Sequence, residues 1–209
     1  NCGVEVFDRA DSTEEFQAMF SVRGKALYTK MDFLFKMIGE ILNSSKLEDT
    51  KRLYEIVASV KSRAQVNLTG AGHSTAVLRA AAYSSPMAAF QDEMAGIGYY
   101  QFIEKLEKDF EQRKEETVEE LCKLMKKILR PENFMISYTG ERESLETVQK
   151  LAGAVKAGLG TEPVEKSKEK LTCTKKNEGF KTSGQVQYVA QTGNFKKKGL
   201  EYTGALEIL

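Results

Sequence analysis

Residues Phe16–Leu42 read FQAMFSVRGKALYTKMDFLFKMIGEIL and contain the change of hydrophobic period that decides the fold class. In the first seven residues apolar and polar side chains mostly alternate, which is the period of a strand with one buried face. Val4 and Val6 show the same alternation ahead of a predicted turn at 8–15. Further on, apolar residues recur at helical spacing, and they are Leu27, Met31, Leu34, Phe35, Ile38, Ile41 and Leu42. The chain is therefore predicted to form two strands and then an amphipathic helix.

Helical periodicity dominates the chain from there to Pro131. Asp49 is a candidate N-cap for the next helix. Ser85-Pro86 interrupts the pattern, because a residue before proline avoids the helical region, and Gly96 and Gly98 loosen the next segment. We expect a hinge-like joint there. The predicted helices cover 49–60 with an extension through 76–83, then 99–110, and then 118–129.

The last third of the chain mixes short strands with one more helix. Asn133–Thr139, closed by Gly140, is an apolar run typical of a buried strand, and 145–155 has helical spacing. Residues 161–182 are rich in Lys and Glu, as in a solvated linker, and 185–190 alternate again. The sequence predicts an α+β fold with two layers, a mixed and mostly antiparallel sheet covered on one face by helices. The predicted organisation is a domain over 1–160, a linker over 161–182, and the start of a further domain over 183–209.

Composition excludes several classes of function. Apolar residues make up 41% and charged residues 29% of the chain, and 31 Lys and Arg nearly balance 30 Asp and Glu. This balance favours neither nucleic acid nor a membrane as partner. Three scattered cysteines without a paired spacing argue against a disulfide framework and favour a reducing cytoplasm. A first residue other than Met, and a last helix without a stop signal, lead us to expect an internal piece of a longer chain.

His73 is the only histidine, and it is the first candidate for metal binding. A zinc hydrolase needs two histidines one helical turn apart and a third ligand, so that three side chains converge on the ion. The residues three and four positions further on are Ala76 and Val77. No Ser or Cys has the flanking residues of a hydrolase nucleophile either. His73 is therefore predicted to be a helix-face or packing residue, and the predicted sets of catalytic, cofactor and metal residues are empty.

The remaining motifs also favour structural roles. Gly70-Ala-Gly72 and Gly96-Ile-Gly98 each match two glycines of a dinucleotide loop, but both follow helical pattern, so close backbone packing is the prediction. Asp92 and Glu93 point about 100° apart on a helix and cannot act as an acid–base pair, so we expect both at the surface. The basic stretches are predicted to be solvated charges rather than phosphate sites, and they are 166–176 and Lys196–Lys198.

A longer pattern resembles a known family. The run Gly72–Pro86, GHSTAVLRAAAYSSP, continues through Glu93–Gly98 to Phe102–Leu106 and resembles the third domain of the presequence protease branch of the pitrilysin and insulinase family. Leu47–Leu53 fits this resemblance too. Asn133 to Gly140 looks like the returning strand of that domain, and 202–209 looks like the first helix of the fourth domain.

The resemblance implies a zinc endopeptidase of four domains, whose two halves close around unfolded peptides in a chamber. Its zinc ligands and general base lie in the first domain, and an Arg and a Tyr that assist substrate binding lie in the fourth domain beyond Leu209. No family site residue can therefore be placed in this chain. The parent protein is expected to be a zinc metalloendopeptidase and this fragment alone to be inactive, with the catalytic half of the same polypeptide and peptide substrates as its partners.

One departure from the family pattern carries a further expectation. Relatives begin the third domain with a strand and a helix ahead of Asn1, and Cys2 stands where they have a glycine. The sheet of the fragment would then have an unpaired edge, which invites association with a second copy. The competing hypothesis is a structural or binding protein that has a peptidase-like fold and no activity.

Overall fold

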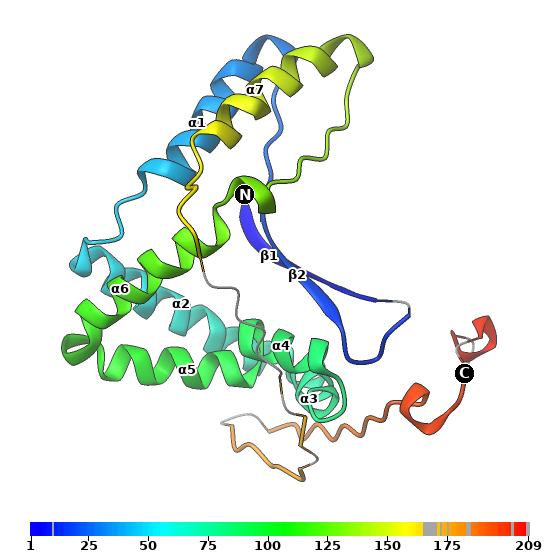
Figure 1. The fold of residues 1–209 in the computed structure, drawn as a ribbon. Coiled ribbons are helices and arrows are strands. Elements are labelled where there is room, and N and C mark those ends of the chain that lie inside the picture. The colour runs from blue at the N-terminus through cyan, green and yellow to red at the C-terminus, as the bar shows by residue number, and fades with distance from the viewer. Residues whose placement is uncertain are drawn as a thin grey trace. The chain divides into compact units, whose positions relative to one another are not determined.

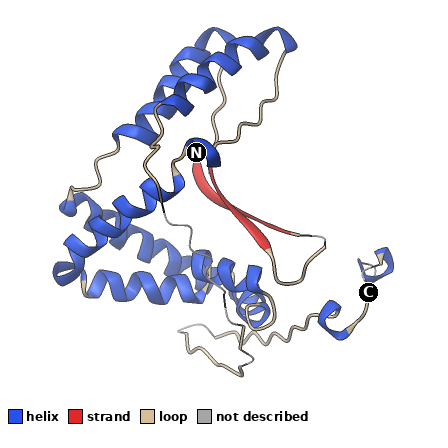
Figure 2. Ribbon diagram, in the orientation of Figure 1, coloured by secondary structure: helices blue, strands red, loops and turns tan. Residues whose placement is uncertain are grey.

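The computed structural model describes residues 1–9, 11–164, 171, 173–174, 176–182, 185–201 and 203–207. The chain is mostly helical with one small sheet, so the α+β class is confirmed (Figure 2). It divides into two compact units. Unit 1 comprises the described residues of Asn1–Val4, Phe20–Leu53 and Glu111–Ser167, and unit 2 comprises those of Glu5–Met19, Tyr54–Phe110 and Lys168–Leu209.

The first two predicted strands are present and pair with each other. They are β1 (Cys2–Asp8) and β2 (Phe16–Val22). The two later strand predictions are wrong for the described residues, because 134–139 and 185–190 have no regular secondary structure. Alternating apolar residues are only one requirement of a strand. A neighbouring strand must also supply backbone hydrogen bonds, and in the described part of the chain the sheet has two strands only.

The predicted helices are present, with altered bounds. They are α1 (Met31–Ser44), α2 (Thr50–Gly70), α3 (Gly72–Ala81), α4 (Pro86–Ala95), α5 (Ile97–Lys108), α6 (Phe110–Ile128) and α7 (Leu145–Ala157). Short 3-10 turns occur at Tyr28–Lys30, Pro131–Asn133, Arg142–Ser144, Lys196–Lys198 and Gly204–Glu207. The helix start predicted at the C-terminal end is thus a 3-10 turn in its described part, and 208–209 lie outside the described residues.

Helix α6 begins eight residues earlier than its apolar pattern predicted. Its first turns are charged rather than apolar, and ion pairs three residues apart join their side chains. Arg113 lies 2.9 Å from Glu116, and Lys114 lies 3.1 Å from Glu111. Such pairs stabilise a solvated helix although nothing apolar marks it in the sequence.

The expected joint after Ser85 is confirmed as a helix start with a defined cap. The Ser85 hydroxyl accepts a hydrogen bond of 3.3 Å from the backbone N–H of Ala88, and Pro86 occupies the first helical position. Both residues suit these places, because serine satisfies a free N–H group and proline has none to satisfy. A second break follows at Gly96, where α4 ends and α5 begins.

Unit 1 has an apolar core between α1 and α7, which lie side by side in Figure 1. Val148 is only 2% exposed. The fully buried members of the core are Met31, Phe35, Val148, Ala152 and Val155. Phe134 and Tyr138 pack against it from the segment that was predicted to be a strand. The apolar pattern of that segment therefore predicted burial correctly and the backbone conformation incorrectly.

Unit 2 is built around α3, α4, α5 and the part of α2 that belongs to it. The rings of Tyr54 and Phe110 lie 5.3 Å apart, and Phe110 is 2% exposed. The Lys61 ammonium lies 2.6 Å from the Glu107 carboxylate and links α2 to α5. The predicted division into 1–160, 161–182 and 183–209 stays a prediction, and 165–170, 172 and 175 of the predicted linker lie outside the described residues.

Candidate functional site

The most buried charged side chain of the described chain is Asp92, at 1% exposure near the end of α4. Its Oδ1 accepts a hydrogen bond of 3.0 Å from the N–H of Ile97, and its Oδ2 accepts one of 3.1 Å from the N–H of Gly98. These groups open α5, where backbone N–H groups lack partners inside the helix and the helix dipole favours a negative charge. Asp92 therefore caps α5 from the preceding helix.

The expectation that both Asp92 and Glu93 lie at the surface is wrong for Asp92. Glu93 is exposed as expected. The two side chains diverge because neighbours on a helix point about 100° apart. One faces solvent, while the other faces the start of α5, where two N–H groups offset the cost of burying its charge.

Gly96 and Gly98 are the residues that let this carboxylate approach the backbone. A Cβ atom at Gly96 would overlap Asp92 Oδ1, and one at Gly98 would lie 2.8 Å from Asp92 Oδ2. Any larger residue would push the carboxylate away from the N–H groups it accepts from. Close packing at this glycine pair is therefore confirmed, and the group packed against it is a carboxylate of the same chain.

Arg79, in the last turns of α3, is the cation that pairs with Asp92. Its Nη1 lies 2.6 Å from Asp92 Oδ2, and the two side chains are 18% and 2% exposed. The other side of the guanidinium faces a distant part of the chain, because Nε donates to Glu178 Oε2 at 3.0 Å. Nε also lies 3.2 Å from the Tyr83 hydroxyl. One guanidinium thus joins a helix cap to a residue 99 positions away.

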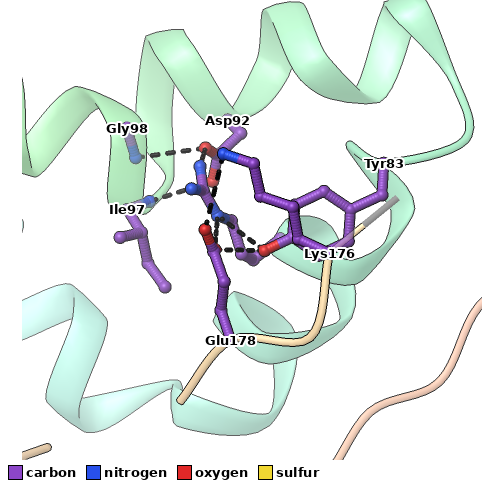
Figure 3. A network of polar contacts seen from close by, with 7 residues as sticks. Tyr83, Asp92, Ile97, Gly98, Lys176 and Glu178 are labelled. Atoms are coloured by element: carbon purple, nitrogen blue, oxygen red, sulfur yellow. Dashed lines mark hydrogen bonds and ion pairs between the residues drawn. The ribbon is translucent and has the colours of Figure 1, made fainter. Parts of the chain in front are cut away.

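Tyr83 and two further residues complete the network, and Figure 3 shows Asp92 and Glu178 converging on the same group of contacts. The Tyr83 hydroxyl donates to Glu178 Oε2. Lys176 Nζ lies 3.7 Å from Glu178 Oε1. The rings of Tyr83 and Phe180 lie 5.6 and 5.7 Å from the guanidinium carbon of Arg79, within the range of cation–π attraction. All of these residues belong to unit 2.

The network holds its groups in fixed protonation states. Burial lowers the pKa of Arg79, but hydrogen bonds to Glu178, Asp92 and Tyr83 outweigh burial and leave that pKa above its ordinary value. Burial, together with the hydrogen bond to Glu178, raises the pKa of Tyr83. Hydrogen bonds from Arg79 and Tyr83 lower the pKa of Glu178. At neutral pH none of these three groups is ready to exchange a proton, so the arrangement suits positioning rather than acid–base chemistry.

Comparison with known proteins places this network in a family. A sequence model matches residues 1–106, which include Arg79, Tyr83 and Asp92, and its description is a region associated with peptidases of family M-16, subfamily C. The chain belongs to this peptidase-associated family. The match covers both strands and most of the helices of unit 2, so the family pattern includes the Asp92 cap.

Individual relatives of this peptidase-associated chain are much longer than it is. Protein HypA of Clostridium perfringens is 30% identical over 207 residues, which cover 99% of this chain and 21% of the relative. Presequence protease 1, chloroplastic/mitochondrial, of Arabidopsis thaliana is 25% identical over 214 residues, which cover 99% and 20%. Mitochondrial presequence protease of Yarrowia lipolytica is 28% identical over 97 residues, which cover 46% and 10%. The resemblance to the presequence protease branch is confirmed, and the chain spans about a fifth of the length of the first two relatives.

The residues of this peptidase-associated chain do not fit a zinc ion. His73 is exposed on α3, and its ring centroid lies 6.0 Å from that of Tyr188. Ala76 and Val77, one turn further along, offer no ligand atom. Within the part of the chain that the structure describes, no three His, Cys, Asp or Glu side chains gather closely enough to hold a metal. His73 is a helix-face residue, as its sequence setting predicted.

The cysteines and the basic stretches have been placed as well. Cys2, Cys122 and Cys173 are free thiols, and burial raises the pKa of Cys173. Lys196–Lys198 forms an exposed 3-10 turn, as predicted, and Lys197 Nζ lies 2.6 Å from Glu14. Lys176 takes part in the Glu178 network, while 166–170 and 175 lie outside the described residues. Among the described helices, none combines the length and the apolar character that crossing a bilayer requires.

The sequence contained only part of the signal for this site. Arg79 and Tyr83 are four residues apart, so their contact is foreseeable once the helix is predicted. Asp92 followed by Gly96-Ile-Gly98 is a second local signal, because glycines one turn after a carboxylate allow it to cap the next helix. Glu178 has no local signal at all, since 99 residues separate it from Arg79.

Proposed function

We propose that this chain is part of the non-catalytic half of a zinc-dependent endopeptidase that degrades unfolded peptides in a closed chamber. The observation that carries the proposal is the alignment of 99% of the chain with a presequence protease of Arabidopsis thaliana. In this proposal the chain encloses the peptide and does no chemistry itself, while the catalytic half of the same polypeptide holds the zinc ion. The parent protein is that longer polypeptide.

The proposed role divides the work between metal and scaffold. The zinc ion, held elsewhere in the parent, supplies an activated water for attack on the peptide bond. The residues of this chain supply rigidity, because a chamber wall that holds a substrate in one geometry removes part of the entropic barrier. The Asp92 cap and the α1–α7 core are two devices of that kind. We further propose that the complete domain has the layered metallohydrolase layout, with a larger sheet than the described one.

Hydrolysis of an unstructured peptide by the purified parent protein tests this proposal. We expect cleavage of the peptide and not of a tightly folded protein of similar size, loss of activity with a zinc chelator, and recovery on adding zinc. The 209-residue chain alone should show neither cleavage nor stoichiometric zinc by metal analysis. A parent that binds peptides without cleaving them would instead support a structural or binding protein. Stoichiometric zinc in the isolated chain would contradict the assignment of chemistry to the other half.

We also propose that the isolated chain associates with itself through the β1–β2 sheet. Each strand has one edge without a strand neighbour in the described structure, and Val4 and Phe7 of β1 are 45% and 47% exposed. Such edges are templates for pairing with another copy. Sedimentation should reveal a dimer that Val4→Lys weakens and Leu200→Lys, at a 62% exposed residue outside the sheet, does not. A monomer over a wide concentration range would contradict the idea. A reducing, cytoplasmic location is proposed on the strength of the free thiols.

A further inference from the structure

The described residues of 176–188 contact helix α3 at both of its ends, and Figure 1 draws this stretch beside α3. Near the C-terminal end of the helix, Glu178 is bonded to Arg79 and Tyr83. At the N-terminal end, the ring of Tyr188 lies against Gly72. Seven helical residues between Gly72 and Arg79 span about 10 Å. The ten residues from Glu178 to Tyr188 are long enough to cover that span in the opposite direction.

Gly72 forms a notch for the Tyr188 ring. A Cβ atom at Gly72 would lie 2.6 Å from Tyr188 Cε2, so any other residue would displace the ring. Gly70, two residues earlier, has no atom within 4 Å of the corresponding position. The two glycines of the Gly70-Ala-Gly72 motif therefore differ, and only the second is required by a close contact.

The contacts of this stretch with α3 come from side chains. No backbone–backbone hydrogen bond joins 185–190 to another segment among the described residues. Val186 and Val189 are 66% and 87% exposed, while Tyr188 between them is 47% exposed. A segment held by a few side chains, without a hydrogen-bonded backbone, opens at a much smaller free energy than the helices beneath it.

We propose that 176–188 is a detachable strap on α3, held by an Arg79–Glu178 latch at one end and by Tyr188 in the Gly72 notch at the other. Arg79 stays in place when the strap leaves, because Asp92 binds its other nitrogen at 2.6 Å. Release of the strap therefore leaves α3, α4 and α5 folded. It frees the guanidinium face of Arg79 and the chain beyond Tyr188. This proposal goes beyond the proposed function and does not depend on zinc or on proteolysis.

Limited digestion of the full-length protein with a lysine-specific protease tests the strap. The peptide bond after Lys181 lies between the two anchors, and a protease needs a detached, extended segment, so its cleavage rate follows the open population. Mass spectrometry would follow this bond together with the bond after Lys46, an exposed residue in the loop between α1 and α2, as an internal reference.

Two matched pairs of variants address the two anchors. Gly72→Ala should accelerate cleavage after Lys181 by about tenfold or more, whereas Gly70→Ala should not. Glu178→Gln should act similarly through the latch, with Glu201→Gln, at an exposed residue further along, as its control. Cleavage after Lys46 should stay constant in all four variants. Because alanine favours a helix over glycine, Gly72→Ala should not weaken α3 itself.

Two results would overturn the strap. The first is equal cleavage after Lys181 in Gly72→Ala and in the unaltered protein, which would show that the notch holds nothing. The second is accelerated cleavage that is accompanied by loss of helix in the circular dichroism spectrum of Gly72→Ala. That outcome would show that the segment is part of the folded core and not a detachable strap.

Discussion

The α1–α7 pair of unit 1 and the α3–α5 group of unit 2 are stabilised by different forces. The first is an apolar core of five buried side chains, which needs only volume and shape to match. The second contains a buried carboxylate whose two oxygens accept from two N–H groups and one guanidinium. An apolar core tolerates similar replacements, whereas a polar network fails when one member is lost. The two regions should therefore respond differently to substitution and to pH.

The largest expected effect comes from breaking the polar network at its centre. Asp92→Asn keeps the volume but removes the charge that Arg79 and the start of α5 require. We expect the free energy of unfolding to fall by about 3–5 kcal/mol, measured by urea denaturation. Glu93→Gln, at the exposed neighbour, should change it by less than about 0.5 kcal/mol. Equal effects of the two substitutions would mean that Asp92 is not a structural cap.

The apolar counterpart is Val148→Ala in α7. Removing two methyl groups from a side chain that is 2% exposed should cost about 2 kcal/mol. Leu145→Ala, at a 42% exposed residue of the same helix, is the matched control and should cost clearly less. The cost of Val148→Ala should be the same in low and high salt. A strong salt dependence would show that the core of unit 1 is coupled to charged groups.

The same substitution should have opposite signs in the two regions. Gly96→Ala places a Cβ atom against the Asp92 carboxylate and should destabilise the chain by about 1–2 kcal/mol. Gly153→Ala, in the interior of α7 with nothing within 4 Å, should stabilise it by about 0.5–1 kcal/mol. Thermal unfolding of both variants measures the difference. Stabilisation by Gly96→Ala would contradict the close approach of Asp92 to the backbone.

The smallest expected effect is a response to acid in unit 2. The pKa of Glu178 is below its ordinary value of 4.5 because Arg79 and Tyr83 donate to the carboxylate. A lowered pKa in the folded state contributes stability that is complete above 4.5 and is lost as the pH falls through the folded value. Glu178→Gln should therefore lose less stability than the unaltered chain on acidification from 4.5 downwards. Denaturation series at stepwise lower pH would detect this difference, and parallel curves would contradict it.

Local pattern predicted most helices because each pattern reports a local property. The spacing of Met31, Phe35 and Ile38 predicted a buried helix face, and Ser85-Pro86 predicted the start of α4. Local pattern failed at 134–139, where alternation reported burial of Phe134 and Tyr138 but could not report whether a strand lay beside them. It also failed at the start of α6, where ion pairs took the place of an apolar stripe.

The sequence by itself determined the α+β class, the sites of most helix boundaries, the free cysteines and the family, because all of these depend on residues that are near one another in the chain or on the overall pattern. Only the tertiary structure decided that Asp92 is buried and that Glu178 reaches Arg79 across 99 residues. Burial of a charge depends on which donors the fold brings to it, and that cannot be deduced from the charged residue and its neighbours alone.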